Sequence, residues 1–192
     1  TVKFLEFNGA AYRCVIMRDI TTRKAAEAQR AQQTLALMSL WKANIFKQGH
    51  FAETIQEITR VAADTLKVER VGVWLFSNNR TKLQCIDLYE AITEQHSVGN
   101  ELWAVDYPQY FQALEKERII AAHDACHDPR TVECAANYLI PLGIASMLNA
   151  PIRIDEGLAV VLCHEHIGSP RVWTLDEQSF ANSLADILAI AI

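Results

Sequence analysis

The sequence has no apolar run long enough to cross a lipid bilayer. A membrane-spanning helix needs about 20 consecutive apolar residues, whereas the apolar run Leu158–Cys163 has only six. The N-terminus also lacks the positively charged segment followed by an apolar segment that marks a secretory signal. From these absences we expect a cytoplasmic location and no membrane span within the 192 residues.

Cysteine is scarce, and its positions follow no metal-binding pattern. The scattered, odd-numbered set argues against a disulfide framework and fits reduced thiols; it consists of Cys14, Cys85, Cys126, Cys134 and Cys163. A glycine-rich phosphate loop is also missing, and no Ser or Cys has a catalytic base at a recognisable spacing. We therefore expect a chain that is not an enzyme and holds no metal.

Basic stripes of the kind that bind nucleic acid are missing from most of the chain. The formal net charge is -5, but residues 1–50 carry eight Lys or Arg against three Asp or Glu, and residues 51–192 carry ten against twenty. An acidic main segment would repel a phosphate backbone. Nucleic acid is therefore not an expected partner.

What the sequence does contain is ample apolar material, 51% of residues, and a clear hairpin near its end. Two apolar runs within residues 146–166 flank Asp155-Glu156-Gly157, a short connection typical of antiparallel strands. The run Leu158–Cys163 is apolar on both alternating faces. Such a strand is buried on both sides, which places it in the middle of a sheet.

The first residues predict a second hairpin followed by a long helix. Residues 2–7 and 10–18 alternate around Asn8-Gly9, a dipeptide suited to the positive φ angles of a two-residue turn. Two strands alone are marginally stable in water, so this hairpin is expected to belong to a larger sheet. Asp19 and the two following Thr residues can cap a helix that runs to about Lys47.

That helix carries a weak apolar stripe, which suggests a parallel homodimer. Its 3-4 spacing is that of a two-stranded seam, formed by Ala28, Ala31, Leu35, Met38 and Ile45, with Lys42 as an interruption. Ile187, Ile190 and Ile192 offer further apolar surface on the closing helix, with which the seam is expected to bundle. The alternative is a surface helix that packs on its own domain.

The remaining elements alternate between helices and strands. Apolar periodicity and turn residues predict, in order, a helix over 51–67, strands over 71–76 and 83–89, a short helix from Pro108, a strand over 119–122, a helix from Asp128-Pro129 to Gly143, and a closing helix after the capping box Thr174-Leu175-Asp176-Glu177. On the helix before Gly143, Val132, Ala136 and Leu139 are expected to pack inward. Cys134 and Tyr138 should lie on the opposite face, toward solvent or a pocket.

This order of elements resembles the GAF domain of bacterial sensor histidine kinases and diguanylate cyclases. The resemblance covers about residues 35–192 and is most specific in YFQALEKERIIAAHDACHDPRT, in YLIPLGIASMLNAPIRIDEGLAVVLCHEHIGSPRVWT and in the closing helix. It implies an α+β fold with a central antiparallel sheet flanked by helices. The segment NGAAYRCVIMRDITTRKAAEAQ resembles the end of a PAS domain, whose exit motif corresponds to Asp19, Ile20 and Thr21.

From these resemblances we expect three parts: the truncated PAS hairpin over 1–20, a signalling helix over 21–48 and a GAF domain over 49–192. The resemblance implies a non-catalytic sensory module of a signal-transduction protein, which binds a small molecule, dimerises, or does both to control an output domain. Its pocket would lie between the sheet and the intervening helices and would be lined by Trp103, Tyr107, Tyr110, Phe111, Asp124, Cys134 and Tyr138. The same aromatic residues suit a plain core, so a ligand-free dimerisation scaffold is the alternative.

The family includes domains that bind bilins and domains that bind cyclic nucleotides, and each class has characteristic residues that can be looked for in this sequence. In phytochrome-type domains a Cys followed by His holds a bilin, with a Tyr four residues on and a Gly near the helix end. Cys134, Tyr138 and Gly143 match that layout, but residue 135 is Ala, and the dipeptide Cys126-His127 lies before the helix. The Asn-Lys, Phe, Asp-Glu pattern of cyclic-nucleotide binders is absent. We therefore expect no identifiable cofactor.

The segment Cys163-His164-Glu165-His166 looks like a metal cluster, but its pattern argues against one. In a strand, His164 and His166 lie on one face, with Cys163 and Glu165 on the other. The four side chains cannot converge on one ion. We expect them to have a structural role at the end of the strand.

Overall fold

The computed structural model describes residues 2–15, 19–42, 51–154 and 157–192. It divides into two compact units, Thr1–Gln32 and Gln33–Ile192. The division falls within the helix α1 (Thr21–Lys42). The end of the predicted helix at Lys47, and with it Ile45 of the predicted seam, lies outside the described residues.

The first unit contains the predicted hairpin, in which β1 (Val2–Phe7) pairs antiparallel with β2 (Ala10–Val15). The turn residues Asn8 and Gly9 have φ angles of 52° and 75°, as a two-residue hairpin with the right twist requires. Helix α1 begins at Thr21, whose backbone N–H donates to Asp19 Oδ1 at 2.8 Å. The side chains of Asp19, Ile20 and Thr21 are exposed.

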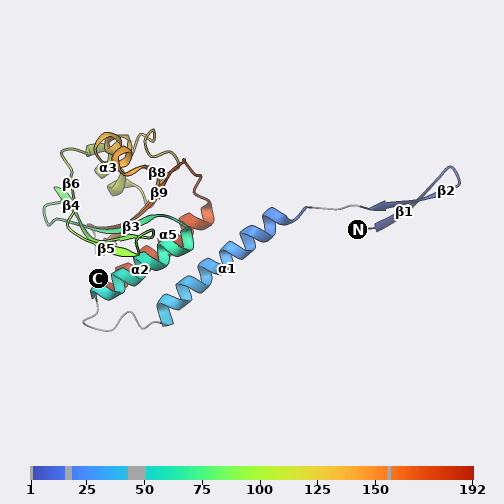
Figure 1. Cartoon of the computed structure of the whole chain (residues 1–192), viewed down its shortest axis with the longest axis horizontal. Coiled ribbons are helices and arrows are strands. Elements are labelled where there is room, and N and C mark those ends of the chain that lie inside the picture. The colour runs from blue at the N-terminus through green and yellow to red at the C-terminus, as the bar shows by residue number, and fades with distance from the viewer. Residues whose placement is uncertain (1, 16–18, 43–50, 155–156) are drawn as a thin grey trace. The chain divides into compact units, whose positions relative to one another are not determined.

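The second unit is built on one antiparallel sheet (Figure 1). Its strands are β3 (Arg70–Phe76), β4 (Lys82–Glu90), β5 (Gln95–Ser97), β6 (Glu101–Trp103), β7 (Ile120–Ala122), β8 (Ile144–Ile154) and β9 (Gly157–Ile167). The order across the sheet is β5-β4-β3-β9-β8-β7, with β6 also paired to β4. The apolar strand β9 therefore lies between β3 and β8, which confirms its predicted central position.

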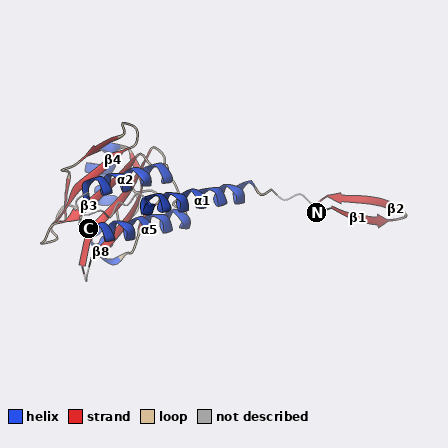
Figure 2. Cartoon of the chain, turned by 90° about the horizontal axis from the view of Figure 1, so that it is seen from below, coloured by secondary structure: helices blue, strands red, loops and turns tan. Residues whose placement is uncertain are grey.

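One face of the sheet is covered by helices α2 (Phe51–Leu66) and α5 (Leu175–Ala191), which lie side by side (Figures 1 and 2). Their apolar stripes pack on alternate residues of the central strands, such as Leu148 and Leu162. Leu40 of α1 is fully buried in the same cluster. The part of α1 around Leu40 therefore packs on its own domain, as the alternative to a dimer seam expected.

The opposite face of the sheet, called here the α3 face, is covered by α3 (Pro108–Lys116) and by the irregular segment Val132–Leu142. The side chains of this face come from the other set of alternate strand residues, including Trp74, Val161 and Cys163. The second unit therefore has three layers and two separate apolar clusters.

The helix predicted from Asp128-Pro129 is wrong at its start. The Asp128 carboxylate accepts from the backbone N–H of Arg130 at 2.9 Å and from its Nε at 2.8 Å, but residues 129–131 form a turn and not the first turn of an α-helix. The helical backbone begins at Val132 as a 3₁₀ turn and continues as a π turn over Ala135–Leu139 and a single α turn over Ile140–Leu142. Gly143, at φ 68°, ends it as predicted.

The predicted inward face of that helix is wrong for Val132 and Ala136, whereas Leu139 is buried as predicted. Val132 is 41% exposed and Ala136 is exposed, whereas Cys134 is 1% exposed and Tyr138 is half-buried against the same cluster as Leu139. The prediction used 3.6 residues per turn throughout, but 3₁₀ and π turns rotate successive side chains by other angles. Cys134 and Tyr138 are thereby turned toward the sheet.

Other local predictions are confirmed. The capping box is present, because Thr174 Oγ1 accepts from the Glu177 N–H at 3.2 Å and Glu177 Oε2 accepts from the Thr174 N–H at 2.8 Å. The short strands β5 and β6 were not predicted, since each has only three residues. Among the described helices, none has both the length and the apolar character that a membrane crossing requires.

Candidate functional site

The interior of the α3 face holds a buried carboxylate. Glu165 of β9 is 2% exposed; its Oε2 accepts from Arg70 Nε at 2.9 Å and its Oε1 accepts from the Tyr138 hydroxyl at 2.7 Å. Arg70 also donates to Glu90 of β4, nearer the surface. The three residues Arg70, Glu165 and Tyr138 come from β3, from β9 and from the π turn, so the site ties the sheet to the irregular segment.

Strand register explains how these residues meet. Arg70 of β3 is the direct cross-strand partner of both Glu165 on β9 and Glu90 on β4. Directly opposed residues in an antiparallel pair point to the same side of the sheet. Tyr138 is added from above by the π turn, where its ring makes an edge-to-face contact with Trp74 at a centroid distance of 6.4 Å.

The electrostatics of this group follow from its burial. Burial raises the pKa of the Glu165 carboxyl, against the opposing effects of the Arg70 charge and the hydrogen bonds from Tyr138 and Arg70. Burial also raises the pKa of the Tyr138 hydroxyl well above 10, and the nearby Glu165 charge adds to the shift. Tyr138 therefore stays protonated and serves as a donor to the carboxylate.

A second polar group lies on the same face. Asn149 Nδ2 of β8 donates to the Tyr110 hydroxyl of α3 at 3.1 Å, and that hydroxyl lies 3.9 Å from Cys163 Sγ of β9. Asn149 is fully buried, and its Oδ1 has no hydrogen-bond partner among the described residues. Exchanging the amide oxygen and nitrogen would leave an N–H unpaired instead, so one amide atom lacks a partner in either orientation. Buried polar groups are nearly always paired in proteins.

Three cysteines belong to this cluster, namely Cys85, Cys134 and Cys163. Burial raises the thiol pKa of Cys85 and of Cys134 to about 12, and that of Cys163 well above 9. A thiol is nucleophilic only as the thiolate. These side chains are therefore neutral packing groups at physiological pH.

The structure brings five of the seven predicted pocket residues together. Tyr107, Tyr110, Phe111 and Cys134 are buried in the cluster of the α3 face, and Tyr138 packs against it. The rings of Tyr110 and Phe111 meet edge to face at 6.2 Å. These residues share one interior although they come from two separate segments of the chain.

The other two predicted residues lie elsewhere. Trp103 of β6 is 43% exposed, with Lys82 Nζ 5.1 Å from its ring centroid. Asp124 is half-buried in a turn, where its carboxylate lies 3.0 Å from His127 Nδ1. Neither belongs to the buried cluster of the α3 face.

Sequence reasoning missed Arg70, Asn149 and Glu165 as members of this site. A signal was present, because charged or amide side chains within otherwise apolar strands are rarely buried without a partner. Asn149 and Glu165 both lie in the predicted hairpin, on either side of the run Leu158–Cys163 that was predicted to be buried. Which partner each one meets depends on the register between strands, and that register is set by residues far apart in the chain.

The four residues Cys163-His164-Glu165-His166 divide between the two faces. Cys163 and Glu165 face α3, whereas His164 is buried on the other side, with Nδ1–H donating to the Leu148 carbonyl at 2.7 Å. His166 Nδ1 lies 3.0 Å from Glu69 Oε2. Within the described residues, no three His, Cys, Asp or Glu side chains are grouped to hold a metal ion.

The residues present do not fit a bilin. Cys134 would be the attachment point, but its thiol is 1% exposed and neutral, and Ala135 stands where the bilin-binding layout has His. The space above the sheet is filled by side chains that are nearly fully buried, among them Tyr110 and Leu139.

Comparison with solved structures finds the same fold in several kinds of protein. A phycocyanobilin-bound GAF domain from a cyanobacterial phytochrome is 23% identical, with a TM-score of 0.68 over 83% of this chain and 92% of that one. The GAF domain of an Acinetobacter phosphoenolpyruvate-protein phosphotransferase is 17% identical (TM-score 0.66; 82% and 90% covered). A free methionine-R-sulfoxide reductase from Neisseria meningitidis, in complex with its substrate, is 14% identical (TM-score 0.64; 84% and 88% covered).

At these identities the likeness shows the fold alone. A search of the curated proteins finds no match to the sequence. The family model described as GAF domain matches residues 50–192, well over half of the chain. The chain therefore belongs to the GAF domain family, whose fold serves regulatory and sensory ligand-binding modules.

Proposed function

We propose that residues 49–192 form a non-catalytic sensory module that binds a small organic molecule on the α3 face. The observation that carries this proposal is the unpaired amide atom of Asn149, fully buried beside the Tyr110 hydroxyl. An unpaired buried polar atom costs about 1–3 kcal/mol. A ligand with one complementary hydrogen-bonding group would remove that cost, and the free energy regained would favour binding.

The surroundings define the chemistry of the ligand. Aromatic and aliphatic side chains form most of the interior, and the polar groups are few and fixed. This pattern suits a small, largely apolar or aromatic molecule with one or two polar groups. Entry requires the covering segment to move, and that cover includes the π turn Ala135–Leu139, which departs from regular α-helical hydrogen bonding.

Native mass spectrometry of freshly purified protein tests ligand binding. We expect a reproducible adduct that is no buffer component, and we expect Asn149→Leu to lose it because Leu offers no polar atom. His127→Gln, a change at an exposed side chain, is the matched control and should keep the adduct. Clean apo protein from several expression hosts, with the same masses in all variants, would contradict the proposal.

No catalytic role is assigned to the module. One structural neighbour is a free methionine-R-sulfoxide reductase. In this chain Cys85, Cys134 and Cys163 of the α3 face are buried, Cys126 is partly buried against them, and burial raises the pKa of all four thiols. We therefore expect no reduction of methionine sulfoxide when the purified chain is assayed with a dithiol reductant. Turnover that depends on Cys134 would overturn this assignment.

We further propose that the module belongs to a cytoplasmic bacterial protein of the histidine kinase or diguanylate cyclase type, with residues 1–20 as the end of a PAS domain and 21–48 as a connecting helix. The hairpin β1-β2 and the contact between Asp19 and Thr21 support this interpretation. A peptide of residues 1–20 should show no hairpin signal by circular dichroism, because two strands alone are marginal. A stable isolated hairpin would contradict it.

A second candidate function is a ligand-free dimerisation scaffold. The observation in its favour is a row of exposed apolar residues on α1, where Leu35, Met38 and Trp41 are 66%, 51% and 52% exposed. Ile190 and Ile192 near the end of the chain are 63% and 46% exposed. Ala28, the first predicted seam residue, is exposed as well.

Light scattering tests this candidate, and we expect it to find a dimer. A chain that stays monomeric at about 10–100 µM, the range of ordinary transient affinities, would contradict it.

A further inference from the structure

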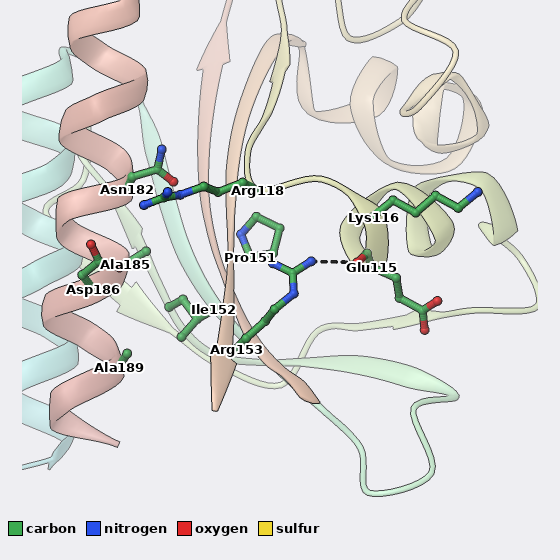
Figure 3. A pocket seen from close by; sticks show the side chains of 10 residues that line it. All are labelled: Glu115, Lys116, Arg118, Pro151, Ile152, Arg153, Asn182, Ala185, Asp186 and Ala189. Carbon is green, nitrogen blue, oxygen red and sulfur yellow. Dashed lines mark hydrogen bonds between the residues drawn. The ribbon is translucent and has the colours of Figure 1, made fainter. Parts of the chain in front are cut away.

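A cavity of about 540 Å³ lies at the outer edge of β8, beyond the end of β7 (Figure 3). Its floor is formed by Pro151, Ile152 and Arg153 of β8. One wall is α5, with Asn182 and Asp186, and the other is the end of α3 together with Arg118, which follows it. None of its lining residues belongs to the group of polar side chains on the α3 face.

The floor of this cavity is an open strand edge. β7 pairs with β8 only at Met147–Asn149, whereas β9 pairs with β8 as far as Ile154. Within the described part of the chain, no strand therefore pairs with the outer edge over residues 150–154. At such an edge alternate residues present main-chain N–H and C=O groups to any extended chain that approaches, and Pro151 can offer only its C=O.

The walls hold the groove open. Arg153 Nη2 donates to the carbonyls of Leu114, Glu115 and Glu117 at 3.3, 2.7 and 3.3 Å, which fixes the end of α3 to the strand (Figure 3). The opposite wall is fixed by the burial of α5 against the sheet. A preformed groove loses little conformational freedom on binding.

The groove also carries unused positive charge. Figure 3 shows the Arg118 side chain extending toward Asn182 of α5. Arg118 and Lys116 are exposed, and neither forms a hydrogen bond or ion pair with the described residues. Asp186 lies one turn further along α5, and the Glu115 side chain points away from that helix in Figure 3. The cationic end of the groove is therefore the end near Arg118.

We propose that this groove binds an extended peptide that adds as a strand to β8 at residues 150–154 and sets an acidic side chain against Arg118 and Asn182. Five strand residues span about 17 Å at roughly 3.3 Å per residue. The main-chain hydrogen bonds supply affinity, and the charge selects the sequence. The partner is thus a segment of another protein with β-forming residues and an acidic residue at the end that meets Arg118, and its binding is independent of a ligand on the α3 face.

The test uses the full chain and a fluorescein-labelled peptide of alternating Thr, Val and Glu, measured by fluorescence anisotropy. We expect saturable binding and at least tenfold weaker binding to Arg118→Glu. Lys24→Glu makes the same charge change on α1, outside the second unit, and should leave the affinity unchanged. Amide chemical-shift changes on binding should be largest at Ala150, Ile152 and Arg153.

Changes in the peptide keep the test independent of protein folding. A peptide in which Lys replaces Glu, and one with N-methyl groups on alternate amides, should both bind at least tenfold more weakly. If the N-methylated peptide binds as tightly as the unmodified peptide, main-chain hydrogen bonds do not hold it, and the proposal is overturned. Displacement of the unmodified peptide by succinate would show a site for small anions and would overturn the proposal as well. Binding unaffected by Arg118→Glu, or no saturable binding, would overturn it as well.

Discussion

At the scale of single residues, the Tyr138 hydroxyl and the Arg70 guanidinium keep the Glu165 carboxylate in the interior. Its two oxygens are satisfied separately, at 2.7 Å and 2.9 Å. Replacing a buried ion pair by apolar residues is often harmless, but removing one partner leaves a charge unpaired and is costly. Removing either donor alone should therefore lower the free energy of unfolding more than replacing the whole group by apolar residues.

We predict that Tyr138→Phe destabilises the domain by about 1–3 kcal/mol, because Glu165 Oε1 then loses its donor in a water-excluded site. Urea unfolding followed by tryptophan fluorescence measures the change. Tyr89→Phe is the matched control, since Tyr89 is buried but its hydroxyl makes no hydrogen bond to the described residues. Equal losses in the two variants would show that the hydroxyl of Tyr138 has no special role.

His164 gives a prediction on pH. Burial lowers its pKa to about 4, although the hydrogen bond to the Leu148 carbonyl opposes the shift. The unfolded chain, with a pKa near 6.5, binds the proton first as the pH falls. Stability should therefore be lost between about pH 6.5 and 4, by up to about 3 kcal/mol from this residue.

Unfolding free energies between pH 4.5 and 7.5 check this prediction. His164→Gln should flatten the pH dependence over that range, because the variant has no proton to bind there. His127→Gln removes a histidine whose side chain is 82% exposed and should leave the slope as it is. The same slope in the wild type and in His164→Gln would refute the role of His164.

At the scale of elements, β3 is the strand that allows the α3 face to be packed so closely. A Cβ atom at Gly72 would lie 2.8 Å from Trp74 Nε1 and 3.3 Å from Leu88 Cδ1. The missing side chain lets the indole of Trp74 lie over the strand, where it meets Tyr138. A glycine in a strand is often a site of such close approach.

Gly72→Ala should therefore destabilise the domain by about 1–3 kcal/mol, as overpacking of a close-packed core does. Thermal unfolding by circular dichroism measures it. The control is Gly157→Ala at the start of β9, where the new methyl group would meet only the flexible end of Arg80. A Tm for Gly72→Ala equal to that of the control would mean that Trp74 adjusts without cost.

At the scale of the whole molecule, the two faces of the sheet have different roles. The face under α2 and α5 is largely an apolar cluster, which buries Leu40 of α1 and, among few polar groups, the His164 imidazole. The α3 face combines apolar packing with buried polar groups. Strands β8 and β9 connect the two faces, since alternate residues of each strand belong to the two clusters.

The exposed row on α1 supplies the prediction at this scale. Leu35→Ser combined with Met38→Ser should weaken self-association at least tenfold, because both residues are exposed in the single chain and would be covered in a dimer. Sedimentation equilibrium measures the effect. Substitution is preferable to removal of the residues before Gly49, since that truncation would uncover the cluster around Leu40.

The control for self-association is Ile92→Ser combined with Val98→Ser, at residues that are 81% and 70% exposed near β5. If this pair weakens association as much as the α1 pair does, the seam on α1 is not the interface. Unchanged association of the α1 variant would lead to the same conclusion.

The sequence by itself was enough for several local features, and its resemblance to the GAF domain implied the fold class. Asn8-Gly9 needs a two-residue turn, Thr174 and Glu177 make a capping box, and the all-apolar Leu158–Cys163 belongs in the middle of a sheet. These features depend on residues close together in the chain, so propensity and periodicity suffice. Five of the seven pocket residues that the family resemblance implied also meet in one interior.

Tertiary structure alone decided the contents of the site. Glu165 meets Arg70 across 95 residues of sequence, Asn149 meets Tyr110 across 39, and the π turn rotates Tyr138 inward against the face expected from helical periodicity. The groove at β8 exists because β7 ends after three paired residues. Register, strand length and irregular turns result from packing among distant segments, which no local pattern records.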